Sequence, residues 1–72
     1  MNLRYLIVIE RTATGFISYS PALDGCVVTG ATRYEVEQNM HDAIEFHLAV
    51  MHPEGYSVPQ PSAYSTYVDI AV

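Results

Sequence analysis

The chain has a single cysteine, Cys26, in the stretch PALDGCVVTGATRYE between Gly25 and Gly30. A cysteine thiolate can act as a nucleophile or a metal ligand, but catalysis needs a base and an electropositive setting that lower the thiol pKa. This stretch offers only valines and a turn. We therefore interpret Cys26 as a small buried hydrophobic residue, and the two glycines as the residues that let the backbone turn on either side of it.

Three histidines, His41, His47 and His52, fall within one predicted helix. Two metal ligands on one helical face normally stand three or four residues apart, whereas these are six and five apart. His41 and His52 share a stripe, but eleven residues separate them by about 16 Å along the axis. We interpret both as solvated, with His41 beside Glu45. His47 falls on the apolar side and is expected to be a core or interface histidine.

Carboxylates could support a metal-dependent nuclease if they converged from the first strand and the helix. Glu10 is near the end of the first strand, and the helical candidates are Glu35, Glu37, Asp42 and Glu45. Most of the helical carboxylates point away from the apolar stripe, which indicates a solvated acidic surface. The segment GCVVTG lacks the lysine of a phosphate-binding loop. The sequence therefore predicts no catalytic centre, metal or cofactor.

Alternating and helical hydrophobic patterns predict one α+β domain over residues 1–72, in the order β-β-β-α-β. The expected strands and helix are Leu3–Arg11, Phe16–Ser20, Cys26–Thr29, Arg33–His52 and Tyr64–Val72. Thr32 and Glu35 match a capping box, which starts the helix. The apolar stripe of the helix comprises Val36, Met40, Ala43, Ile44, His47, Val50 and Met51.

A helical crossover should place the last strand parallel to the first, giving a small mixed four-stranded sheet of order 3-2-1-4 with the helix on one face. The other face would then carry apolar residues that nothing in the chain covers. A second copy or another protein is expected to cover it, and the small size of the chain also favours a homodimer or higher homo-oligomer.

The 72 residues include three arginines, no lysine and eight carboxylates, for a formal net charge of −5. Nucleic-acid binding usually requires the opposite balance, so a basic protein is the expected partner. The run from Tyr5 to Ile9 is too short for a signal-peptide core or a membrane span. A lone cysteine excludes an intramolecular disulfide and fits a reducing cytoplasm.

The sequence resembles the HicB-like antitoxin family over nearly its whole length, through RYLIVIE, TGFISYSPALDGCVVTGAT, EVEQNMHDAIEFHL and YVDIAV. The most specific pattern is P-x-L-x-G-C-x-x-x-G-x-T, from Pro21 to Thr32. Asp24 departs from the family, which often has a second proline there. The helical segment AIEFHL is also family-like, so the resemblance assigns His47 to the fold.

The resemblance implies a truncated ribonuclease H-like domain without a working active site. Such a domain would neutralise HicA, a small basic ribonuclease toxin that cleaves mRNA, by capping its active surface. The C-terminal DNA-binding domain of many members is expected to be missing. The expected contact residues are Glu10, Tyr19, Asp24 and Asp69. Two alternatives are an orphan homo-oligomeric adaptor without a toxin and a residual metal-dependent nuclease.

Overall fold

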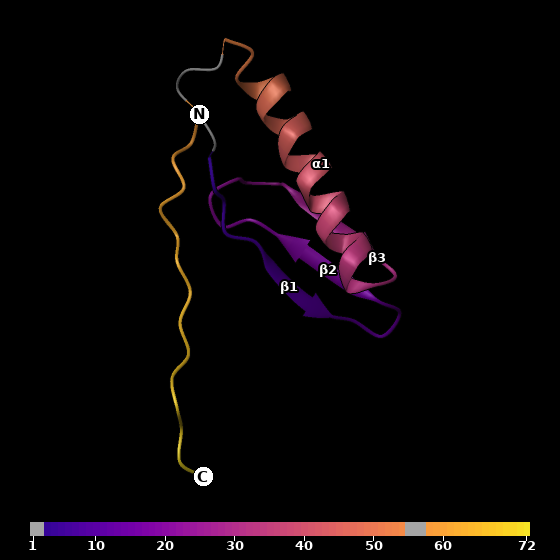
Figure 1. Cartoon of the computed structure of the whole chain (residues 1–72), viewed down its shortest axis with the longest axis vertical. Coiled ribbons are helices and arrows are strands. Elements are labelled where there is room, and N and C mark those ends of the chain that lie inside the picture. The colour runs from indigo at the N-terminus through magenta and orange to yellow at the C-terminus, as the bar shows by residue number, and fades with distance from the viewer. Residues whose placement is uncertain (1–2, 55–57) are drawn as a thin grey trace.

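The computed structural model describes residues 3–54 and 58–72. It has two layers, a three-stranded antiparallel sheet and one helix packed on one of its faces (Figure 1). The elements are β1 (Val8–Arg11), β2 (Phe16–Tyr19), β3 (Val27–Gly30) and α1 (Arg33–Met51). Neighbours in the sequence are neighbours in the sheet, in the order β1-β2-β3.

Two short connections set the register of the sheet. The β1–β2 loop is closed by the amide of Thr12, which donates to the carbonyl of Gly15 over 2.8 Å, next to the last pair, Arg11 and Phe16. The β2–β3 connection contains Gly25 at a φ of +78°, a left-handed conformation that glycine adopts at little cost. The predicted role of Gly25 as a turn residue is therefore confirmed.

The helix-facing side of the sheet carries the core. Ile9, Ser18 and Val28 lie side by side across the three strands and share this side. The fully buried Ser18 has a hydroxyl without a hydrogen-bond partner among the described residues. The buried apolar cluster contains Leu23, Cys26 and Met40, with these partly buried side chains around it: Tyr5, Ile7, Ala22, Val28, Ala43, Ile44 and Leu48.

The junction between β3 and α1 is tightly packed. A Cβ atom on Gly30 would lie 2.6 Å from the backbone nitrogen of Val36, so only glycine allows this approach. The hydroxyl of Thr32 accepts a hydrogen bond from the amide of Glu35 at 3.0 Å, as predicted for the cap. The carboxylate of Glu35 reaches one residue further back than in a standard capping box and accepts from the amide of Ala31 at 3.1 Å.

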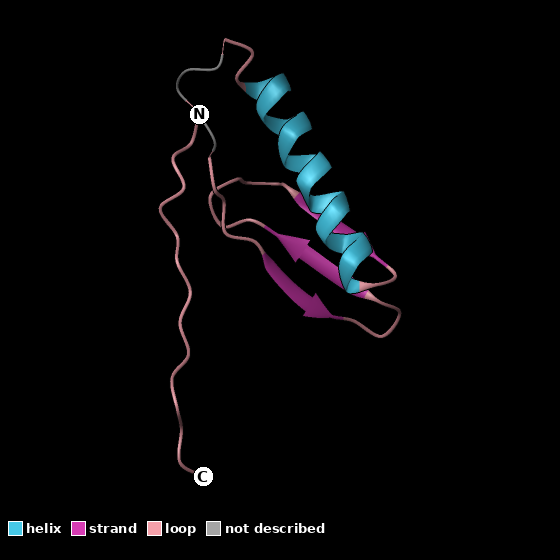
Figure 2. Ribbon diagram, in the orientation of Figure 1, coloured by secondary structure: helices cyan, strands magenta, loops and turns pink. Residues whose placement is uncertain are grey.

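Helix α1 extends past the sheet that it covers (Figure 2). Nineteen helical residues span about 28 Å, whereas four-residue strands span about 13 Å. Val36 and Met40, in the first half of the helix, are buried, but Val50 and Met51 are exposed. The prediction that Val50 and Met51 belong to the buried stripe was wrong, because no strand of the described chain lies beneath this end of the helix. No helix in the described ranges has the length and apolarity needed to cross a membrane.

The first strand is shorter than predicted: β1 begins at Val8, and residues 3–7 lie outside it. Towards the N-terminus of β1, the last residue pair with β2 is Val8 and Tyr19. After Ser20 the chain enters a turn at Pro21, so β2 does not continue beside residues 3–7. Residues 3–7 therefore lie beside no strand in the part of the chain that the structure describes. Individual hydrogen bonds hold them instead, including one from the Ser20 hydroxyl to the carbonyl of Leu6 at 2.9 Å.

The predicted fourth strand, Tyr64–Val72, is absent. Residues 58–72 form an extended segment without regular secondary structure, and most of it lies away from the sheet (Figure 1). The order 3-2-1-4 is therefore wrong, and so is the four-stranded, truncated ribonuclease H-like sheet. β1 lies at an edge of the sheet and not in its interior. Alternation indicates that a segment can form a strand, but it does not specify a partner.

Candidate partner-binding face

The sheet face opposite α1 is the candidate binding surface, and we call it the open face. Strand alternation places six side chains there: Val8, Glu10, Ile17, Tyr19, Val27 and Thr29. Four of the six are apolar or aromatic. Val27 is 54% exposed and Tyr19 is 38% exposed. An apolar face of this kind, with charged residues near it, is typical of a protein-interaction surface.

Two of the four predicted contact residues lie on the open face. Tyr19 is paired with Val8, and Glu10 is the next residue of β1 on the same side, so Glu10 and Tyr19 are diagonal neighbours across two strands. Asp24 is exposed in the connection that leads from Tyr19 to Val27, at one end of this face. The structure thus brings Glu10 and Tyr19 together on one face, and Asp24 lies in the connection that follows Tyr19.

Asp69, the fourth predicted contact residue, is not part of this group. It is exposed in the extended segment that leaves the body of the protein (Figure 1). Its predicted position relied on a fourth strand paired with the first strand at the edge of the sheet. Val27, which sequence reasoning did not select, is on the open face instead, and the alternation of β3 was the signal that could have identified it.

The surface carries more acidic than basic side chains. All eight carboxylates are exposed. Two of the three arginines are engaged locally: Arg33 pairs with Glu37 at 3.5 Å, and the guanidinium of Arg11 stacks over the ring of Phe16 at 5.8 Å. These exposed pairs are screened by solvent and contribute little to stability. The net charge of −5 gives the protein a negative field that extends beyond its surface.

Cys26 is a core residue, as predicted. Its thiol is free and buried beside Leu23 and Met40. Burial raises the pKa of the Cys26 thiol, which is the opposite of what a nucleophile at neutral pH requires.

The histidines do not form a shared site. His41 is exposed and contacts Asp42 at 3.3 Å and Glu45 at 3.8 Å, so the predicted pairing with Glu45 is confirmed. His47 is half-buried. His52 was predicted to be solvated, but it is half-buried and caps the helix through its amide, which donates to the carbonyl of Leu48 at 2.9 Å.

Sequence reasoning missed the group formed by His41, Asp42 and Glu45, whose side-chain ligand atoms lie within 4.8 Å of one another. All three residues are exposed, and none is held by a buried partner. Glu10 is on the other side of the sheet from α1, so it cannot join them. The convergence of carboxylates that a two-metal nuclease would need is not present among the described residues.

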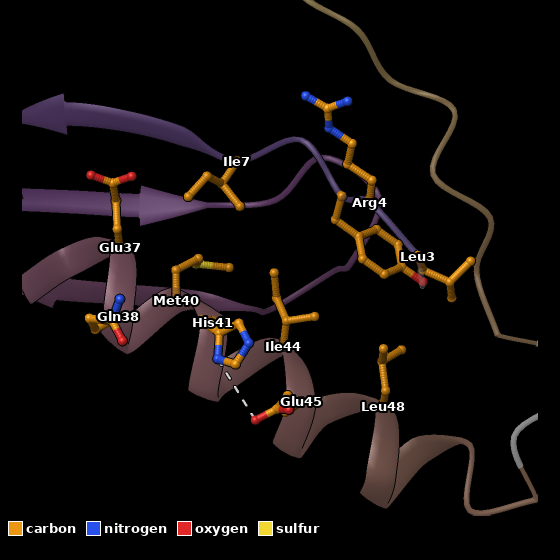
Figure 3. A pocket seen from close by; sticks show the side chains of 11 residues that line it. Leu3, Arg4, Ile7, Glu37, Gln38, Met40, His41, Ile44, Glu45 and Leu48 are labelled. Carbon is orange, nitrogen blue, oxygen red and sulfur yellow. Dashed lines mark ion pairs between the residues drawn. The ribbon is translucent and has the colours of Figure 1, made fainter. Parts of the chain in front are cut away.

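A groove lies on the opposite side of the molecule from the open face. It has a volume of about 670 Å³ and runs between the flank of α1 and residues 3–7. Figure 3 shows Met40, Ile44 and Leu48 projecting from α1 towards the segment that carries Ile7. Its rim is polar and includes Arg4, and its floor is apolar. We call it the α1 groove.

Comparison with solved structures finds a similar protein, the antitoxin HicB3, described by a crystal structure. The TM-score is 0.67 and the sequence identity is 35%, and the match covers 79% of this chain. The same match covers 42% of the antitoxin, so the chain spans less than half of the length of that protein. No protein-family model matches the chain, and no curated protein matches it significantly.

Proposed function

We propose that this chain, which is similar to the HicB-like antitoxins in both sequence and fold, is the antitoxin of a toxin–antitoxin pair. The observation that carries the proposal is the 35% identity with antitoxin HicB3 on a shared fold. That similarity confirms the resemblance indicated by the P-x-L-x-G-C pattern. In the structure this pattern forms the β2–β3 connection and part of the core, through Leu23 and Cys26.

The expected partner is a small basic ribonuclease of the HicA type, neutralised by stoichiometric capping of its RNA-binding surface. The acidic charge of this chain supports such a partner, because opposite charges speed the encounter and select the partner. The exposed apolar side chains of the open face would then be buried in the complex. No chemistry is required of this chain, which fits the burial of its one thiol.

The proposed contact surface is the open face, with Glu10 and Asp24 as the charged contacts and Tyr19 as the aromatic one. A half-exposed tyrosine surrounded by aliphatic side chains is typical of residues that dominate binding energy. Asp69 is proposed as a further contact, made from the extended segment.

The test is titration of the purified chain against the protein encoded by the neighbouring gene, with RNA cleavage as the readout. We expect the chain to suppress cleavage at an equimolar ratio. Glu10→Lys combined with Asp24→Lys should weaken binding about tenfold or more and make the remaining binding less sensitive to salt. Tyr19→Ala, tested separately, should cost about 2 kcal/mol of binding free energy.

The matched control is Asp42→Lys combined with Glu54→Lys, which changes the net charge by the same amount at exposed positions outside the open face. It should slow association only slightly. Equal losses of binding affinity in both double variants would show that binding depends on the net charge of the chain and not on the open face. If the wild-type chain does not suppress cleavage and forms no complex in solution, the antitoxin proposal is wrong and an orphan adaptor is favoured.

A further inference from the structure

The α1 groove is apolar where it is deepest, and nothing in the described chain fills it. Its apolar lining is formed by Leu3, Tyr5, Ile7, Met40, Ile44 and Leu48. The groove exists because α1 covers β2 and β3 and leaves the side of β1 free. It therefore lies where side chains from a strand added beside β1 would pack against the helix.

β1 begins directly after Ile7, which lines this groove, and the outer edge of β1 is open. β1 is an outer strand, and within residues 3–54 and 58–72 it pairs with β2 alone. An outer strand presents a row of free backbone donors and acceptors, which is a template for another strand. Residues 3–7 directly precede β1, and four of them line the groove: Leu3, Arg4, Tyr5 and Ile7.

The segment 62–72, which we call the tail, has the properties of the missing strand. Every residue in it is exposed, and none is in a hydrogen bond with another described residue. Val68 is 77% exposed and Ile70 is 74% exposed, and both are on one side of an alternating pattern with Thr66 and Val72. Asp69 is its only charged residue. A soluble chain seldom leaves so many apolar side chains in water without a partner surface.

The path of the chain directs the tail away from its own groove. The hydroxyl of Tyr5, a residue that lines the groove, donates to the carbonyl of Pro59. This hydrogen bond holds the segment that precedes the tail beside the groove. Beyond Pro61 the chain departs from the body (Figures 1 and 2). Eleven extended residues reach about 36 Å, and the longest dimension of the molecule is 49 Å. That reach is sufficient to cross onto a neighbouring molecule.

We infer that the tail of one copy inserts beside β1 of a second copy and fills its α1 groove. Each copy has one tail and one groove, so two copies exchanging tails form a closed dimer with two-fold symmetry. Val68 and Ile70 would occupy the apolar floor, while the backbone of the tail pairs with the free edge of β1. The open face lies on the other side of the sheet and stays accessible in this dimer.

The test compares tail variants by light scattering coupled to size-exclusion chromatography. The wild-type chain should have twice the mass of one copy at micromolar concentrations. Val68→Asp combined with Ile70→Asp should give a monomer, because both carboxylates would enter the apolar floor. The matched control, Tyr67→Asp combined with Ala71→Asp, adds the same charge on the other side of the tail and should remain a dimer. All variants should keep the helical circular dichroism signal, since the tail is outside the folded body.

A mixing experiment separates exchange between copies from pairing within one copy. Leu3→Asp blocks the groove at a residue that is 39% exposed and outside every helix and strand. Alone, the groove variant and the tail variant should both be monomers. Mixed in equal amounts they should associate, because an intact tail meets an intact groove. A monomeric wild type at all concentrations, a dimer that survives both tail changes, or a mixture that does not associate would each overturn the inference.

Discussion

Cys26 packs with Leu23 and Met40 at the centre of the core, where burial raises the pKa of its thiol. Its role could be predicted from the sequence because its nearest neighbours along the chain are apolar and contain no base. The spacing of the three histidines likewise predicted that they do not share a metal site. It could not predict that Asp42 would join His41 and Glu45, because the side-chain rotamers that bring the three together are not encoded in spacing.

The state of Cys26 can be checked with a thiol reagent. In the folded chain at pH 8 we expect the thiol to react about a hundredfold or more slowly than in concentrated urea, because reaction requires opening of the core. The folded state holds the thiol proton more tightly than the unfolded chain does. The free energy of unfolding should therefore be unaffected by this group below the ordinary thiol pKa of about 8.5, and should fall as the pH rises through the higher pKa of the folded state.

The control is Cys26→Ala, which lacks the titrating group and should show a smaller loss of stability over the same alkaline range. Tyr5 also has a raised pKa because of burial, so part of the alkaline loss should persist in that variant. Equal reaction rates in the folded and urea-unfolded chains would contradict the assignment of Cys26 to the core.

Local signals predicted the secondary structure elements well where the elements depend on nearby residues. The helix begins after Thr32, as the capping pattern indicates, and ends at Met51, one residue before the expected end. The strands that follow tight turns were also predicted to within one residue. Residues 3–7 were not, because whether an apolar run becomes a strand depends on how far its neighbour β2 continues.

The helix cap offers a direct test at this scale. Thr32→Ala removes the acceptor for the amide of Glu35 and should lower the free energy of unfolding by about 1 kcal/mol in urea titration. Thr32→Ser keeps the hydroxyl and should stay within about 0.5 kcal/mol of the wild type. If alanine and serine are equally stable at this position, the cap contributes nothing.

The contact between β3 and α1 is a second test. Gly30→Ala places a methyl group against the backbone of Val36, which cannot move without shifting the helix, so we expect a loss of about 1–3 kcal/mol. Gly25→Asn is the matched control, because asparagine tolerates a positive φ and a Cβ at Gly25 meets open space. A Gly30→Ala chain that unfolds at the wild-type urea concentration would show that the helix does not approach β3 this closely.

For the whole molecule, the arrangement of the sheet was the part that sequence reasoning got wrong. The expectation of order 3-2-1-4 rested on a general rule that a helical crossover returns the chain beside its starting strand. The tail has the alternating pattern of a strand, but it is exposed along its whole length and pairs with no strand of its own described chain. The pairing of a segment that is distant in sequence depends on all the surfaces to which it can bind, including those on other copies. A single sequence does not specify which of these surfaces it binds.

The order β1-β2-β3-α1 has a kinetic consequence, because every strand pair in the body joins residues close in sequence. The most distant partners, Phe16 and Gly30, are fourteen positions apart. Strand pairs of this kind require only short loops to close, which costs little entropy, so the sheet of each copy should form before any second copy is met. Assembly through the tail is bimolecular and should follow as a slower phase whose rate depends on concentration. A newly made chain would thus be folded, and its open face formed, before it met its second copy.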